Sequence, residues 1–392
     1  MRTFRSLRHR NYRLYFAGQL VSLVGSWTQI TALTWLAHEL THEAKWPAFL
    51  AAVQIGPTFL LGPWGGSLAD RVPKRGLIIR TQAVFLVCAL VLLGLYWGGL
   101  LTVGAMLGVM FAHGIVQAID LPARLAFVPG LVGRDDLANA VALNSLLFNV
   151  ARAIGPALAG LLLVSAGAEW CFIVNAFSYL AIIVALALIR IPPEPVPADP
   201  GNTHGGFRVL AGRPGMLTLV LLAGLVAIGG WPLLPLLPYL ADNELGHGRE
   251  GYGTLLSAVG IGALAGALTA ASIANEVRRK VLLFGGLVLV SWGLAGLSVT
   301  PPLPVAAGCC VLFGYGMILF FATGQTVVQL GTADADRGKV MGVWAMMLSA
   351  GVPLGNLAFG PAADVVGVTR VISIQAAMIA IAAGVLLVRR VE

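Results

Sequence analysis

Apolar stretches of roughly 20 residues recur from one end of the chain to the other, separated by short segments that carry charge, glycine or proline. Each stretch is long enough to cross a hydrocarbon layer of about 30 Å as an α-helix. A helix is required there, because unpaired backbone groups are costly in lipid. The pattern predicts twelve transmembrane helices, at residues 12–37, 47–69, 77–98, 102–121, 138–164, 170–189, 216–240, 252–274, 281–299, 304–328, 339–362 and 369–388.

Composition supports an all-α membrane protein. The chain has 392 residues, of which 58% are hydrophobic and 11% are charged, whereas soluble domains carry about 25% charged residues. The four cysteines, Cys88, Cys171, Cys309 and Cys310, lie in or beside apolar stretches without the spacing of a zinc site. We therefore expect no cofactor and no resident metal. The loops are too short to house an enzyme, and no phosphate-binding loop or serine elbow is present.

Basic residues predict the orientation. If both termini are cytoplasmic, 21 of the 25 Lys and Arg residues fall on the cytoplasmic side, as the positive-inside rule requires for an even number of spans. The net charge of +8 then indicates topology and contact with anionic membrane lipid, and it gives no reason to expect a nucleic acid partner. We expect a multi-pass protein of the cytoplasmic (inner) membrane.

The longest polar connection, residues 190–215, is rich in Pro and Gly and divides the spans into six and six. The expected domains are an N-terminal six-helix bundle at 1–190, a cytoplasmic linker at 191–215 and a C-terminal six-helix bundle at 216–392. The fifth spans of the two halves resemble each other, with ARAIGPALAG in one and GVPLGNLAFGP in the other. Internal duplication of this kind is typical of transporters with a binding site between the halves.

A charged stretch after the second span, GGSLADRVPKRGLIIR at 65–80, resembles the loop 2–3 signature of the major facilitator superfamily. The segments 5–29, 119–145, 151–160 and 336–344 resemble the branch that contains enterobactin exporters and macrolide or multidrug efflux proteins. This resemblance implies the major facilitator fold, two six-helix bundles related by a pseudo-two-fold axis. It also implies a monomer that exports small amphiphilic molecules, such as drugs or siderophore-like metabolites, by alternating access in exchange for protons.

The resemblance assigns a conformational latch to the charged stretch. The matching carboxylate, Asp70, would dock near the start of the eleventh helix at 338–341, where the helix dipole favours a negative charge. The matching Arg71 would bond an acid at the end of the fourth helix, for which Asp120 is the candidate. Small residues such as Gly65 and Gly66 would let the second helix approach a neighbour. The alternative is that these charges only fix topology. The residues assigned to the latch are Gly66, Asp70, Arg71, Arg75 and Asp120.

Polar residues inside the spans form stripes at helical spacing, and such residues in lipid usually face a cavity or a partner. The resemblance implies that the first, fourth, seventh and tenth helices line a central cavity. Hydrogen bonding between helices, worth about 0.6 kcal/mol per pair, is the alternative. The residues expected to line the substrate cavity are Gln19, Ser22, Ser26, Gln29, His113, Gln117, Asn149, Arg152, Trp231, Gln325, Gln329 and Trp344.

Arg152 is the costliest of these residues to place near the middle of a bilayer. It precedes Gly155, Pro156 and Gly160, which resemble a helix 5 motif associated with antiporters, although Ala159 departs from that motif. We expect Arg152 either to cap backbone carbonyl groups or to contact substrate. Proton coupling needs a group that titrates in the membrane, and the candidates are His113, Asp120 and Glu39 near the outer end of the first helix. Asp120 is also claimed by the latch and by Arg124 at i+4. A packing role for His113 is the alternative.

Two other substrate classes stay open. A nickel or iron exporter would need clustered ligands, and His38 and His42 with Glu39 and Glu43 form such a cluster near the end of the first span. A lysolipid transporter would suit the very apolar second half. The seventh span ends in WPLLPLLPY at 231–239, whose prolines must bend it. That bend could act as a gate or be a static kink.

Overall fold

The structure is a computed structural model that describes residues 5–133, 136–190, 206–272 and 276–388. The described residues are helical throughout their ordered elements and contain no strand. Eleven helices are long and apolar enough to cross a membrane, or twelve if one bent pair is a single span. The predicted all-α membrane fold is therefore confirmed, and the observed helices fall on the predicted stretches.

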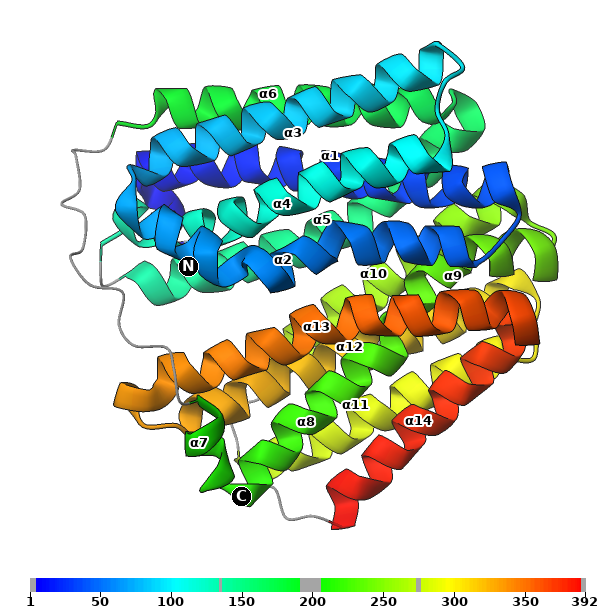
Figure 1. Cartoon of the computed structure of the whole chain (residues 1–392). Coiled ribbons are helices and arrows are strands. Elements are labelled where there is room, and N and C mark those ends of the chain that lie inside the picture. Colours follow the sequence, from blue (N-terminus) through cyan, green and yellow to red (C-terminus); the bar gives the residue numbers. More distant parts are fainter. Residues whose placement is uncertain (1–4, 134–135, 191–205, 273–275, 389–392) are drawn as a thin grey trace. The chain divides into compact units, whose positions relative to one another are not determined.

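The chain divides into two compact units, and the first comprises residues 1–36 and 53–200. It holds most of α1 and α2 and all of the next four helices (Figure 1). Its elements are η1 (Arg5–Arg8), α1 (Arg10–Thr41), α2 (Lys45–Arg71), α3 (Lys74–Trp97), α4 (Val103–Phe127), η2 (Val128–Leu131), α5 (Leu137–Ser165) and α6 (Ala168–Leu188).

The second unit comprises residues 37–52 and 201–392, so the end of α1 and the start of α2 belong to it. The predicted linker at 191–215 is partly outside the described residues, and its remainder includes a short helix. The elements of this unit are α7 (Gly206–Ala211), α8 (Pro214–Gly230), α9 (Leu233–Tyr239), η4 (Leu240–Glu244), α10 (Gly248–Ser272), α11 (Glu276–Leu297), α12 (Leu303–Leu330), α13 (Asp334–Val366) and α14 (Val368–Val388).

Proline shapes two of the spans. Helix α2 bends by 63° between Gly62 and Trp64, around the intervening proline. The seventh span breaks after Gly230, resumes as α9 and ends in a π-helical turn, η4. A proline inside a helix removes a backbone hydrogen bond and clashes with the preceding turn. The break in the seventh span lies within WPLLPLLPY, and a role of this segment as a gate or a static kink stays a prediction.

One glycine in each half marks the same connection. Gly167 joins α5 to α6 with φ of 103°, and Gly367 joins α13 to α14 with φ of 93°. A residue with a Cβ rarely adopts such a backbone conformation. The paired glycines are therefore a backbone counterpart of the sequence similarity between the two fifth spans.

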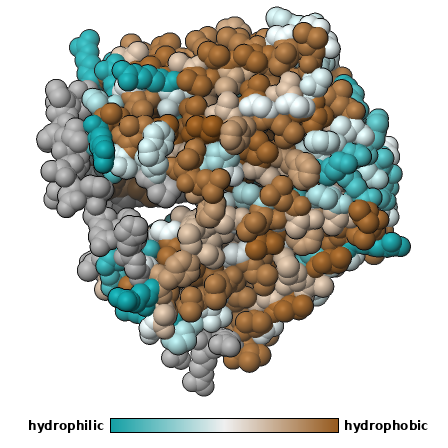
Figure 2. All heavy atoms as spheres, in the orientation of Figure 1, coloured by the Kyte–Doolittle hydropathy of each residue, from teal (hydrophilic) through white to brown (hydrophobic). Residues whose placement is uncertain are grey.

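Apolar side chains lie exposed along the helices, as expected for surfaces that face lipid acyl chains. Examples are Phe177 of α6 and Trp292 of α11, with exposed fractions of 66% and 70%. The visible face in Figure 2 is largely brown over the helices, with the hydrophilic side chains gathered toward helix ends. Such exposed apolar area would be a liability in water.

Candidate functional site

Asp120 on α4 is a completely buried carboxylate in the first unit. Its Oδ1 accepts hydrogen bonds from the Thr81 hydroxyl at 2.5 Å and from the Gln82 amide at 3.0 Å, both on α3. Arg124, one helical turn further along α4, forms an ion pair with the same carboxylate. A buried charge needs such partners, because burial alone would remove its hydration at a high free-energy cost.

These contacts correct one part of the predicted latch. Among the described residues, the partners of Asp120 are Thr81, Gln82 and Arg124, and Arg71 is not one of them. The spacing of Asp120 and Arg124 at i and i+4 puts the two side chains on one helix face, so the local partner takes the place given to Arg71. The predicted docking of Asp70 near 338–341 would join the two units, and it stays a prediction.

His113 lies two turns before Asp120 on α4 and is nearly buried. Its ring stacks on Phe85 of α3, with ring centroids 4.3 Å apart and an interplanar angle of 27°. Within the described part of the chain, His113 Nδ1 and Gln117 Oε1 are buried without a hydrogen-bonding protein group. Buried polar atoms of this kind are usually satisfied by water or by a ligand. We call His113, Gln117 and Asp120 the α4 stripe. It combines two titratable side chains, His113 and Asp120, with buried polar atoms that have no hydrogen-bonding protein group.

The polar stripe of α1 contacts α6 within the same unit. Asn175 donates a hydrogen bond from Nδ2 to Gln29 Oε1 at 2.8 Å. The Ser26 hydroxyl lies 3.2 Å from the Tyr179 hydroxyl and bonds the Ser22 carbonyl group at 2.8 Å. The structure thus gives Gln29 and Ser26 the helix-to-helix role that was the alternative to cavity lining. Gln19 is also buried, and a role in binding substrate stays a prediction for all four.

Sequence reasoning did not identify the residues of α6 that contact the polar stripe of α1. Asn175, Ser178 and Tyr179 lie in WCFIVNAFSYL, and both Asn175 and Tyr179 are buried. A polar amide in a strongly apolar span is a signal that could have found Asn175, because such residues almost always meet a polar partner.

Arg152 on α5 packs over the indole ring of Trp27 on α1, with the guanidinium carbon 5.2 Å from the ring centroid. A cation over an aromatic face gains about 2 kcal/mol when desolvated. Gly155 sits beside this contact, and a Cβ there would overlap the Trp27 side chain. The motif that resembles those of antiporters therefore brings α5 close to α1. Pro156 and Gly160 are buried nearby, and the Asn149 side chain lies outside the described residues.

The first turn of α3 is tied to the end of α6. Arg75 donates hydrogen bonds to the Leu186 and Ala187 carbonyl oxygens, both at 2.7 Å. A Cβ on Gly65 would overlap the Ala118 carbonyl group, so this glycine allows close approach of α2 and α4. Gly66 has nothing within 4 Å of its Cβ position. The prediction of close packing is confirmed for Gly65 and wrong for Gly66.

Two of the predicted cavity residues of the second unit, Trp231 and Trp344, join one aromatic cluster. Trp231 stacks on Phe321 with centroids 6.1 Å apart, and Phe321 meets Trp344 edge-on at 6.5 Å. Phe321 was not among the predicted residues. Gln325 on α12 is exposed. Gln329 is half-buried, and its backbone carbonyl oxygen accepts a hydrogen bond from Arg337 Nε. Residues from the α8–α9 break, α12 and α13 therefore form one aromatic cluster, in which Phe321 and Trp344 are buried.

An open apolar hollow of about 520 Å³ lies between α1, α5 and α6 in the first unit. Leu20, Val24, Leu158 and Phe177 are among its lining residues, and the wall is almost entirely hydrocarbon. None of the predicted cavity residues lines it. Its composition suits an acyl chain better than a substrate that needs polar recognition.

Comparisons with known proteins find transporters among the relatives of this chain. Enterobactin exporter EntS of Escherichia coli is 27% identical over 360 residues, covering 90% of this chain and 85% of the relative. The EntS of Shigella boydii serotype 18 is 28% identical over 361 residues, with the same coverage. These names fit a transporter in the inner membrane and give no indication of an enzyme.

Solved structures share the fold at low identity. The nucleoside transporter NupG has a TM-score of 0.76 at 14% identity, covering 96% of this chain and 98% of that chain. A bacterial homologue of the human lysosomal transporter Spinster has a TM-score of 0.75 at 16% identity, covering 96% of each chain. A bacterial homologue of the iron transporter ferroportin has a TM-score of 0.72 at 16% identity, covering 96% of this chain and 98% of that chain.

The family described as transmembrane secretion effector matches residues 1–392. With its helical spans and its two compact units, the chain belongs to this family of major facilitator superfamily transporters, as a multi-pass protein of the inner membrane.

Proposed function

We propose that this transporter exports small amphiphilic molecules, siderophore-like metabolites or drugs, from the cytoplasm by alternating access and in exchange for protons. The observation that carries the substrate class is the similarity to enterobactin exporters over 90% of the chain. The proposed orientation, with both termini cytoplasmic, follows from the distribution of basic residues. A monomer suffices, because each chain already supplies two units.

Proton coupling is assigned to the α4 stripe. Protonation of Asp120 would remove the charge that pairs with Arg124 and would change which group donates in the bonds to Thr81 and Gln82. His113 lies on the same helix and has hydrogen-bonding capacity to spare. A proton held at either group alters the packing of α4 against α3, and such a packing change is the kind of local event that biases a transporter between two states.

Substrate recognition is assigned to two chemically different surfaces. Trp231, Phe321 and Trp344 form an aromatic cluster for the apolar part of a ligand; Phe321 and Trp344 are buried, so the ligand would meet the cluster at the half-buried Trp231. Polar atoms of Gln19, His113 and Gln117 offer hydrogen bonds. An amphiphilic molecule needs both kinds of contact, whereas a purely apolar ligand would leave the polar atoms unpaired.

The proposal is tested in proteoliposomes that contain the purified protein, with enterobactin and a panel of amphiphilic drugs as substrates. An imposed pH gradient should drive accumulation of at least one substrate, and a protonophore should abolish it. His113→Gln should lower the gradient-driven rate, while the matched control His247→Gln, at an exposed loop position, should not. Transport that ignores the gradient would contradict proton exchange, and transport of none of the panel would contradict the substrate class.

A further inference from the structure

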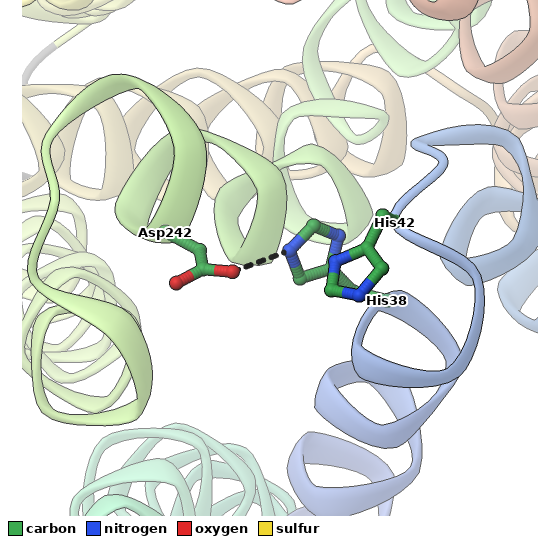
Figure 3. A group of neighbouring side chains, drawn as sticks. All are labelled: His38, His42 and Asp242. Carbon is green, nitrogen blue, oxygen red and sulfur yellow. Dashed lines mark hydrogen bonds and ion pairs between the residues drawn. The ribbon is translucent and has the colours of Figure 1, made fainter.

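Three potential metal ligands meet within the second unit, away from the α4 stripe. His38 and His42 come from the end of α1 and the residue after it, and Asp242 comes from η4 (Figure 3). One ligand atom from each residue lies within 4.8 Å of the others. His38 Nε2 and Asp242 Oδ2 are 3.1 Å apart. These residues are far apart in sequence, so the fold itself brings the third ligand to the histidine pair.

We propose that His38, His42 and Asp242 bind a divalent transition-metal ion such as Zn²⁺. Two imidazole nitrogens and one carboxylate oxygen are a ligand set that suits zinc, iron and nickel, whereas calcium and magnesium prefer oxygen ligands alone. Ligand atoms around a tetrahedral ion lie about 3.3 Å apart when its bonds are about 2.0–2.2 Å long. The separation of His38 and Asp242 already matches this value. His42 is exposed, so its ring has room to approach.

The backbone at this cluster is unusual at two of the three ligands. His42 has φ of 54°, a left-handed conformation, and its N–H bonds the His38 carbonyl group at 2.6 Å. This turn carries the His42 ring to within 5.9 Å of the His38 ring, edge to face. Asp242 lies on a π-helical turn, a rare element that is found frequently at functional sites. Non-glycine residues persist in left-handed backbone where the surroundings impose it.

Neighbouring side chains hold these ligands in place. The fully buried His38 ring meets the edge of Tyr239 at 5.6 Å. Just beyond His42, the Asp364 carboxylate accepts hydrogen bonds from the Ala44 and Lys45 N–H groups at 2.6 and 3.2 Å. Anchoring on both sides of the histidine pair lowers the reorganisation that metal binding would require.

The sequence HELTH at 38–42 has the His-Glu-x-x-His spacing of zinc metalloproteases, in which the Glu is the general base. Here Glu39 is ion-paired with Arg249, and His42 lies past the end of α1. The Glu is therefore occupied elsewhere and the second His is outside the regular helix. These contacts favour a binding site over a hydrolytic one. With three protein ligands, a fourth position is left for water.

The site is tested by Co²⁺ and Zn²⁺ titration of the full-length protein in detergent, after removal of any polyhistidine tag. Co²⁺ should bind with one equivalent and give visible absorption bands of nitrogen and oxygen ligands, and Zn²⁺ should displace it. His42→Ala and Asp242→Asn should each weaken binding by more than the 10–100-fold expected for loss of an outer-sphere partner. The matched control His247→Ala, an exposed histidine of the same unit, should bind as the wild type does.

Metal-free unfolding and gel filtration check that each variant is folded, and His38 itself is left intact because it is buried. Equal Co²⁺ affinity in the wild type, His42→Ala and Asp242→Asn would overturn the proposal, as would an equal loss in His247→Ala. This readout is direct binding, so its outcome is independent of which substrate the protein exports.

Discussion

The contact between the third and fourth spans differs between the two halves. In the first half, α3 meets α4 through Thr81 and Gln82 bonded to Asp120, and through Phe85 stacked on His113. In the second half, α11 meets α12 through glycines. A Cβ at Gly316 would overlap the Gly286 carbonyl group, and one at Gly293 would lie 2.6 Å from the Cys309 carbonyl oxygen.

Two kinds of interface have therefore been built at the same position in the two halves. Close backbone packing through small residues gives van der Waals contact that no proton changes. A contact built on a carboxylate and a histidine depends on protonation. The comparison teaches that the first half is the place to look for proton coupling, because its interface contains titratable groups and the glycine contacts of the second half do not.

The largest effect is expected from Asp120→Asn. The substitution leaves Arg124 without its ion-pair partner, and breaking a buried pair costs about 3–5 kcal/mol of unfolding free energy. Denaturant unfolding in detergent would measure this loss, with Glu244→Gln, an exposed acid, as the control. In a double-mutant cycle, Arg124→Gln should cost little more once Asp120 is already Asn. Additive losses would show that the two residues are not coupled.

An intermediate effect is expected from Gly316→Ala in the glycine interface. The added methyl group must push α11 and α12 apart, and overpacking of this kind costs about 1–3 kcal/mol. Gly308→Ala on the same helix has nothing within 4 Å, so it should be neutral or stabilise by up to about 1 kcal/mol through helix propensity. Thermal unfolding of the two variants measures the difference. Equal stability of the Gly316→Ala and Gly308→Ala variants would contradict close packing of α11 and α12 through glycine.

The smallest effect is expected from Tyr179→Phe, which removes the hydroxyl that lies 3.2 Å from Ser26. Hydrogen bonds between membrane helices contribute about 0.6 kcal/mol. Ser26→Ala should lower the free energy of unfolding by the same amount. The double variant should be almost as stable as either single variant. A combined loss of twice the single values would place the stabilisation elsewhere and would weaken the polar description of the first half.

The sequence predicted the spans well and pointed to the segment in which the seventh one is interrupted, because length, hydropathy and proline act locally. It did not predict which neighbour each polar stripe faces. The face that holds Gln19, Ser22, Ser26 and Gln29 is fixed by helical spacing, but its contact with Asn175 depends on tertiary packing.

The same limit explains the other differences. Arg71 and Arg124 were both available to Asp120, and the local one took the position. Adjacent glycines look alike in sequence, yet only Gly65 meets a neighbouring helix. His38 and His42 were recognisable as a pair, whereas Asp242 could not be joined to them without the fold.

The central claim is that the α4 stripe exchanges protons when substrate binds. The most direct measurement is proton release in a weakly buffered detergent solution, followed with a pH indicator while enterobactin is added to the purified protein. Release is predicted for the wild type and for His247→Gln, and it should fall in His113→Gln and Asp120→Asn variants that still bind substrate. Unchanged release in both of these variants would contradict the account.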